Sequence, residues 1–265
     1  LLLPAVRKFR EAAARIKSQN ILKQIALARH NYHDRKKSLP PGYASAVDAD
    51  LEDLGPGWGW GAYILPDLEQ GNLHSRIRFD QDIGLSYHAI TRVQSLPVFR
   101  CPSDDAPEVF VTEGRPIDLA HGNYVGVFGT SEMEPETLSR GEGVLFRNSR
   151  VKLLDIRDGT SNTIVVGERS SNLSMATWTG AVAGAIVPGP DHGDGHEEDD
   201  DDHDHDHAHA AALVLGHTGD ADEAHTPNNP ENHPGDFFSF HPQGANFVLG
   251  DGSVRMIGDE IDPVV

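Results

Sequence analysis

Apolar residues recur every three or four positions along the first part of the chain. They fall at Leu2, Val6, Phe9, Ala13 and Ile16, and again at Leu22, Ile25 and Ala26. The stretch 5–34 has no Gly or Pro and is rich in Ala, Leu, Lys, Arg and Gln, which favour helix. The spacing therefore predicts an amphipathic helix of about thirty residues. Leu39-Pro40-Pro41-Gly42 ends it, because proline cannot continue a helix.

The pattern changes after this helix to short apolar segments separated by Gly, Asn and Asp turns, which indicates β-strands. The candidate strands are Asn123–Phe128, Gly143–Phe146, Thr163–Gly167, Thr177–Ile186, Ala212–Leu215, Phe237–Phe240, Ala245–Leu249 and Ser253–Ile257. The last two flank Gly250-Asp251-Gly252, a turn sequence that predicts a hairpin. One short helix is expected over Gly61–Leu73, broken at Pro66.

A single helix followed by many strands predicts an α+β fold. The helix needs a surface on which to bury its apolar face, and an antiparallel sheet offers one. We therefore expect a helical segment, 1–38, and a strand-rich body, 39–265, whose C-terminal region is irregular. Residues 187–235 are polar and of low complexity, and they are interpreted as an insertion into this body.

The chain is acidic, with Lys+Arg 22 against Asp+Glu 41 and a net charge of −19. This balance argues against a nucleic-acid partner, whose phosphates require basic residues. The acidity is concentrated in residues 191–210, which hold eight Asp, two Glu and no Lys or Arg. No run of eighteen apolar residues occurs, although Leu1–Val6 could be the end of a membrane segment or signal peptide, or an ordinary helix start.

The acidic tract is also rich in histidine, and imidazole with carboxylate suits divalent metals. The candidate ligands are His196, Asp202, His203, Asp204, His205, Asp206, His207 and His209. Their spacing matches no structural zinc site and no EF-hand. A solvated loop that binds divalent ions loosely, an ordered calcium or zinc site and a catalytic metal site are the three interpretations.

Residues suited to nucleophilic catalysis are sparse. The single cysteine, Cys101, has no obvious base near it in the sequence and is interpreted as structural. Glu168 follows a predicted strand and is expected to be an exposed edge carboxylate, with a general base as the alternative. His241 and Asp251 bracket the last hairpin, but no Ser or Cys accompanies them in the sequence. These patterns favour a non-enzymatic protein.

Several motifs, in order along the chain, resemble a bacterial family of type IV pilin-like proteins with a PulG-like body. They are Asn20-Ile21-Leu22-Lys23-Gln24-Ile25, Ile64-Leu65-Pro66-Asp67-Leu68, Phe99-Arg100-Cys101-Pro102-Ser103-Asp104, Asn123-Tyr124-Val125-Gly126 and Asp158-Gly159-Thr160-Ser161-Asn162-Thr163. The tail is similar too, because His241 is followed after nine residues by Asp251-Gly252, the H-x9-DG signature of that family.

The resemblance implies a pilin fold and assembly through the N-terminal helix. A hydrophobic stem before Leu1 would anchor the precursor in the inner membrane and later pack inside a helical filament of identical subunits. The assembly contacts would be Leu2, Leu3, Val6, Phe9, Ala13 and Ile16. Residues Leu1–Phe9 should then make few contacts with their own domain.

Two departures from the family pattern matter. Family members usually carry a Cys where this chain has Ser18, so a bridge from that position to Cys101, if the family has one, is missing here. The His/Asp tract lies where members vary most, so its role cannot be carried over from the family.

The leading hypothesis is a filament or pseudopilus subunit at the cell surface or in the periplasm, which exposes the metal-binding tract. The alternatives are a monomeric extracytoplasmic metal- or solute-binding protein associated with transport and, less favoured, a metal-dependent hydrolase.

Overall fold

One long helix, α1 (Leu2–Lys36), crosses the molecule and confirms the predicted N-terminal element. The computed structural model describes residues 2–188, 209–219 and 226–262. The helix ends where Lys37 takes a left-handed conformation, with φ of 62°. His33, Arg35 and Lys36 in the last turn place positive charge at the negative end of the helix dipole.

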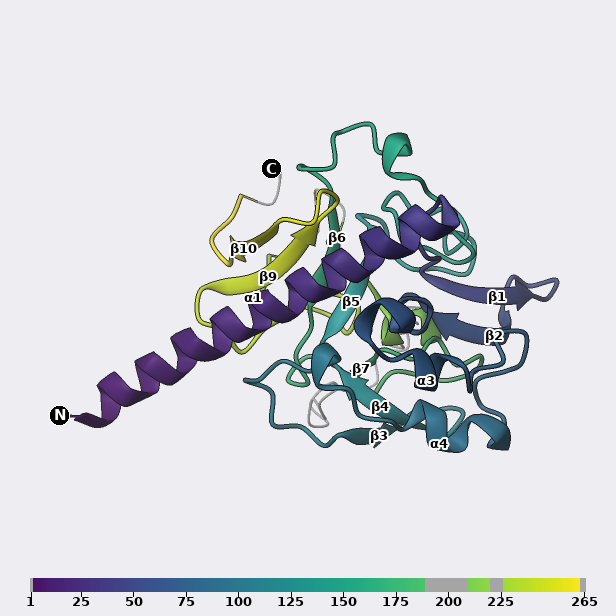
Figure 1. The fold of residues 1–265 in the computed structure, drawn as a ribbon, viewed down its shortest axis with the longest axis horizontal. Helices are drawn as coiled ribbons and strands as arrows, with labels where there is room; N and C mark the ends of the chain where they lie inside the picture. Colours follow the sequence, from purple (N-terminus) through teal and green to yellow (C-terminus); the bar gives the residue numbers. More distant parts are fainter. Residues whose placement is uncertain (1, 189–208, 220–225, 263–265) are drawn as a thin grey trace, which may run out of the picture.

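The C-terminal half of α1 packs on a five-stranded sheet of order β10-β9-β6-β5-β8 (Figure 1). Its strands are β5 (Tyr124–Gly129), β6 (Ile164–Glu168), β8 (Leu215–His217), β9 (Gly244–Leu249) and β10 (Val254–Gly258). Neighbouring strands are antiparallel except β5 and β8, which are parallel. A helix on a mainly antiparallel sheet confirms the α+β prediction.

Two smaller sheets complete the body (Figure 1). One pairs β1 (Tyr43–Val47) with β2 (Asp53–Gly59), and the other joins β3 (Val109–Val111), β4 (Asp118–Gly122) and β7 (Ala176–Thr177). Short helical turns connect them, namely α2 (Trp60–Tyr63), η1 (Leu65–Leu68), α3 (Gly71–His74), η2 (Ser86–His88), α4 (Ala89–Arg92), η3 (Pro97–Phe99), η4 (Leu153–Asp155) and η6 (Ala210–Leu213). The helix expected over Gly61–Leu73 is thus divided among single turns.

Three tryptophans anchor the core between these parts. Trp58, Trp60 and Trp178 are almost fully buried, and the indole N–H of each donates to a backbone carbonyl. Trp60, for example, donates to Val214 O at 3.0 Å, which fixes the chain just before β8. Each large apolar ring is therefore buried with its polar atom satisfied.

The strand predictions are right for β5, β6, β9 and β10 and wrong for several other segments. Gly143–Phe146 and Phe237–Phe240 form no strand. Within Thr177–Ile186 only Thr177 lies in a strand, β7, while Gly180 and Ile186 form isolated bridges. Ala212–Leu215 begins inside the 3-10 turn η6 and reaches only the first residue of β8. These segments are apolar because they turn through the core, where side-chain burial does not require a continuous ladder of backbone hydrogen bonds.

The described parts of residues 187–235 belong to the body rather than leaving it. Strand β8 is fully buried, and the guanidinium of Arg169 donates to the carbonyls of Leu215 and Asp236, at 2.9 and 2.8 Å. An antiparallel bridge between Ile186 and His209 places the two ends of the undescribed stretch 189–208 side by side. The two ends of this stretch therefore lie at neighbouring positions of the body.

Candidate functional site

The predicted metal ligands of the His/Asp tract lie almost entirely outside the described residues. This holds for His196, Asp202, His203, Asp204, His205, Asp206 and His207. His209 is described, and its Nε2 lies 3.8 Å from a carboxylate oxygen of Glu134, with both side chains about half exposed. Metal binding by the tract stays a prediction.

The predicted assembly residues lie along the part of α1 that projects from the body (Figure 1). The exposed fractions are 45% for Val6, 77% for Phe9 and 56% for Ile16, and Ala13 is exposed as well. The side chains of Leu2 and Leu3 lie outside the described residues. The expectation that the first turns make few contacts with their own domain is confirmed for residues 5–9.

The body half of α1 is docked through polar as well as apolar contacts. Leu22 and Ile25 are fully buried, and Ser18 lies on the same face with no exposed surface. The Ser18 hydroxyl donates to Oε1 of Glu168, so the Tyr124 hydroxyl, 2.8 Å from Ser18 Oγ, must act as the donor to it. Burial, followed by the negative charge of Glu168, raises the pKa of Tyr124 and keeps it protonated.

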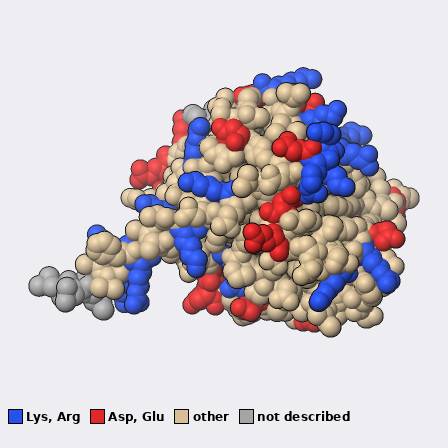
Figure 2. All heavy atoms as spheres, viewed as in Figure 1, with Lys and Arg blue, Asp and Glu red and all other residues tan. Residues whose placement is uncertain are grey.

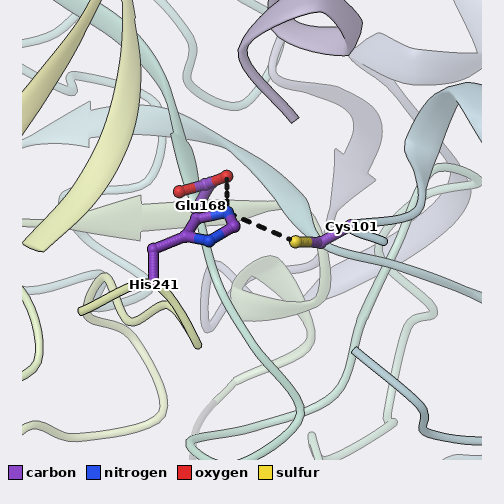
Figure 3. A group of neighbouring side chains, drawn as sticks. All are labelled: Cys101, Glu168 and His241. Atoms are coloured by element: carbon purple, nitrogen blue, oxygen red, sulfur yellow. Dashed lines mark hydrogen bonds and ion pairs between the residues drawn. The ribbon is translucent and has the colours of Figure 1, made fainter. Parts of the chain in front are cut away.

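A buried cluster of Cys101, Glu168 and His241 lies beneath this contact (Figure 3). His241 Nε2 is 3.4 Å from Glu168 Oε1 and 3.7 Å from Cys101 Sγ. The three residues come from the loop after η3, the end of β6 and the loop before β9. The fold therefore brings together a thiol, a carboxylate and an imidazole that are far apart in the sequence.

This geometry corrects two sequence predictions. Glu168 is only 1% exposed, and β6 is an interior strand between β5 and β9, so Glu168 is not an exposed edge carboxylate. Cys101 does have a base near it, because His241 reaches it across 140 residues of sequence. The contact among these residues depends on the order of the strands in the sheet, and the spacing of the residues along the chain does not predict that order.

Glu168 is held by hydrogen bonds from the neighbouring strand β9 and from α1. Its Oε2 accepts from the backbone N–H of Asn246 at 2.6 Å and from Asn246 Nδ2 at 3.0 Å. The Asn246 side chain also accepts from Gln19 Nε2 of α1 at 3.0 Å. A buried carboxylate needs such partners, because leaving it unpaired costs several kcal/mol. Glu168 thus links α1, β6 and β9.

His241 carries positive charge in this cluster when no metal is bound. Burial alone would lower its pKa, but its interactions with Cys101 and Glu168 outweigh burial and raise the pKa to about 9. For His121, another buried histidine, burial outweighs the effect of the neighbouring charges on the pKa. Burial lowers its pKa to about 4, although the nearby Asp104 carboxylate opposes that shift.

The cluster does not have the geometry of a nucleophilic triad. In such a triad the nucleophile and the acid contact opposite ring nitrogens of the histidine. Here Sγ and Oε1 both face Nε2, so the carboxylate cannot hold the imidazole as a base toward the thiol. A pocket of about 260 Å³, lined by Asp53, Arg147 and His209 among others, includes none of the three cluster residues.

The two ends of the H-x9-DG motif have different places in the fold. His241 joins the buried cluster, whereas Asp251 lies in the exposed turn between β9 and β10, where its Oδ1 accepts from the Ser253 N–H at 2.8 Å. Gly252 has φ of +86°, and a Cβ there would lie 3.2 Å from Nε2 of His30 on α1. The Asp-Gly pair therefore shapes a turn that passes close to the helix, and His241 and Asp251 do not form a pair.

Comparison with known proteins gives one match. A family model described as a protein of unknown function (DUF1559) matches residues 7–264. The chain belongs to this family. No curated protein and no solved structure matches the chain. The DUF1559 match includes the cluster, the Asp-Gly turn and most of α1, so the family extends over the helix and the body together.

Among the described residues of this DUF1559 member, no helix is both long enough and apolar enough to span a membrane. Charged residues such as Arg7, Lys8 and Arg10 occupy the other sides of the projecting part of α1.

Proposed function

We propose that this DUF1559 member is a structural subunit of a pilus-like filament or pseudopilus, at the cell surface or in the periplasm. Its contacts with other copies are made by the projecting half of α1. The observation that supports the proposal most directly is the exposure of Val6, Phe9 and Ile16 on helical turns that extend beyond the body (Figure 1).

Physical considerations favour a partner for this segment. A helix of 35 residues is about 50 Å long, and roughly its first half has no sheet beneath it. Isolated helices shorter than about 12–15 residues are marginal in water, and most helical stability in proteins comes from packing an apolar face. Burying one large side chain such as Phe9 contributes about 1.5–3 kcal/mol, so several such residues on each helix would sustain a multi-copy contact.

Charge also favours contacts between copies. Residues 5–17 hold Arg7, Lys8, Arg10, Arg15 and Lys17 against the single acid Glu11, a net charge of +4 (5 − 1), in a chain whose total is −19. The rest of the chain therefore carries −23 (−19 − 4). Figure 2 shows basic side chains along the projecting helix, and both acidic and basic side chains on the visible face of the body. A basic helix on one copy is complementary to an acidic body on the next.

Electron microscopy of the protein expressed with its natural N-terminus tests the proposal. We expect filaments from the unaltered chain and none from Phe9→Glu, which places a charge at the centre of the projecting face. Leu154→Glu is the matched control, because Leu154 is 96% exposed on η4, a turn that meets the last turn of α1 at His33 and not its projecting half. A protein that stays monomeric at every concentration, or a Phe9→Glu variant that still forms filaments, would contradict the assembly role.

The metal-binding alternative depends on residues 191–210 and is tested separately. Calorimetric titration with Zn²⁺ and Ca²⁺ should show sites that disappear when His203, His205 and His207 are replaced by Asn. Equal binding by both proteins would exclude a role for those histidines.

A further inference from the structure

We propose that Cys101, Glu168 and His241 form a structural site for one transition-metal ion of the zinc type, bound through Sγ, Oε1 and Nε2. Within the described part of the chain, this is the one group of three or more His, Cys, Asp or Glu residues whose potential ligand atoms converge, all within 4.8 Å of one another. This site is separate from the His/Asp tract and does not depend on filament assembly.

Two of the three distances between the donor atoms fit a tetrahedral ion, and the third, from Sγ to the carboxylate, is within 4.8 Å. Zinc binds nitrogen and oxygen at about 2.0–2.2 Å and thiolate sulfur at about 2.3 Å, which places neighbouring ligand atoms about 3.3–3.8 Å apart. The Nε2–Oε1 distance of 3.4 Å and the Nε2–Sγ distance of 3.7 Å lie in that range. Sγ of Cys101 and Oε1 of Glu168 both face Nε2 of His241 (Figure 3). A single N–H on Nε2 cannot point at both atoms. An ion placed among the three atoms would contact all of them.

The donor set selects the class of metal. Thiolate and imidazole are ligands of Zn²⁺ and related ions, whereas Ca²⁺ and Mg²⁺ take oxygen ligands. The thiol and the imidazole bind a metal without their protons, so entry of the dication displaces two protons. Thiolate and carboxylate then carry two negative charges, which the ion neutralises in a buried place.

Outer hydrogen bonds hold each of the three residues in position, as metal sites require. Oε2 of Glu168 is occupied by Asn246, which leaves Oε1 directed toward His241. The backbone N–H of Cys101 donates to Asn123 Oδ1 at 2.8 Å, and that of His241 donates to Ser239 Oγ at 3.0 Å. In the folded chain these hydrogen bonds hold the three residues in place independently of an ion.

The position of the site indicates what the ion would do. The three ligands come from three separate segments of the body, and Glu168 Oε1 also accepts the hydrogen bond from Ser18 of α1. An ion here would fasten these segments together directly beneath the docked half of the helix. Because all three residues are buried, we expect the ion to enter during folding rather than from the surface.

Cobalt substitution tests the site in the full chain. The protein is unfolded, freed of metal by a chelator and refolded with one equivalent of Co²⁺. We expect a thiolate-to-cobalt charge-transfer band in the near ultraviolet and visible bands of tetrahedral Co²⁺. Because the chain has a single cysteine, a thiolate band can arise only from Cys101, and the histidines of the tract cannot imitate it.

Matched variants complete the experiment. Cys101→Ser should lose the thiolate band completely, His241→Gln and Glu168→Gln should weaken or shift it, and His203→Asn with His205→Asn should leave it unchanged. Zn²⁺ should raise the Tm of the unaltered protein but not that of Cys101→Ser. A correctly folded protein that shows no thiolate band would overturn the proposal, and so would a band that persists at full intensity in both the His241 and Glu168 variants.

Discussion

The two halves of α1 share a helical sequence but have opposite surroundings. Residues 5–17 are mostly exposed and project from the body, whereas Ser18, Leu22 and Ile25 are buried on the five-stranded sheet. Both halves have apolar residues at three- and four-residue spacing. The difference in burial between the two halves therefore depends on whether a sheet lies beneath the helix. Periodicity alone does not show which apolar face packs on its own domain.

The largest effect is expected from removing the carboxylate beneath the docked half. Glu168→Ala leaves the buried His241 without its ion-pair partner, and Ser18 and Asn246 without an acceptor. Breaking a buried pair in this way costs about 3–5 kcal/mol. Urea unfolding in a metal-free buffer measures the loss. Glu134→Ala, at a carboxylate about half exposed, is the control and should change stability little. Equal effects of the two variants would contradict the structural role of Glu168.

A paired truncation compares the halves directly. Leu22→Ala removes a fully buried side chain from the helix–sheet contact and should cost about 2–5 kcal/mol of unfolding free energy. Phe9→Ala, at a side chain 77% exposed, should cost less than about 0.5 kcal/mol in the monomer. The two values are measured by urea unfolding at a protein concentration at which the chain is monomeric. Similar costs would mean that the projecting half is also packed on its own body.

Acid should weaken the body on which the docked half depends. The folded-state pKa of His121 is lowered to about 4, so between pH 6.5 and 4 the unfolded chain binds more protons than the folded one. Stability should therefore fall across that window, by on the order of 2 kcal/mol. Unfolding curves at several pH values measure the slope, and His121→Gln should reduce it. An unchanged slope in the variant would assign the acid sensitivity to other groups.

The smallest expected effect is that of salt on association through the projecting half. Its basic side chains are exposed, so their attraction to an acidic body on another copy is screened within about 8 Å at physiological ionic strength. Light scattering should show that rising salt slows assembly, and Arg7→Gln with Arg10→Gln should remove most of that dependence. Faster assembly at high salt would indicate that apolar contact alone governs association.

Local sequence patterns predicted the elements whose conformation depends on the residues within them, such as the long helix and the last hairpin turn. The absence of Gly and Pro marked α1, and Gly250-Asp251-Gly252 marked the turn between β9 and β10. Strands β1 to β4 were missed, because β2 contains Pro56 and three Gly, which are usually read as turn residues. Their pairing is decided by tertiary packing around residues such as Trp58 rather than by alternation along the chain.

The candidate site was less predictable than the fold. Cys101 and Glu168 were each noticed in the sequence, but their contacts with His241 span 140 and 73 positions. Such contacts depend on β6 lying between β5 and β9 and on the loop before β9 folding back toward Cys101. One signal was available: the H-x9-DG resemblance singled out His241, although its partners proved to be Cys101 and Glu168 rather than Asp251.

The bridge between Ile186 and His209 has a consequence for how this molecule can change. Paired residues in an antiparallel bridge lie about 4.5–5.5 Å apart, so the body holds the two ends of this connection close together. Closing a longer or shorter connection between two such fixed points costs little, about 0.6 kcal/mol for each doubling of length. The body should therefore tolerate a connection of different length between these two residues with little change in folding free energy.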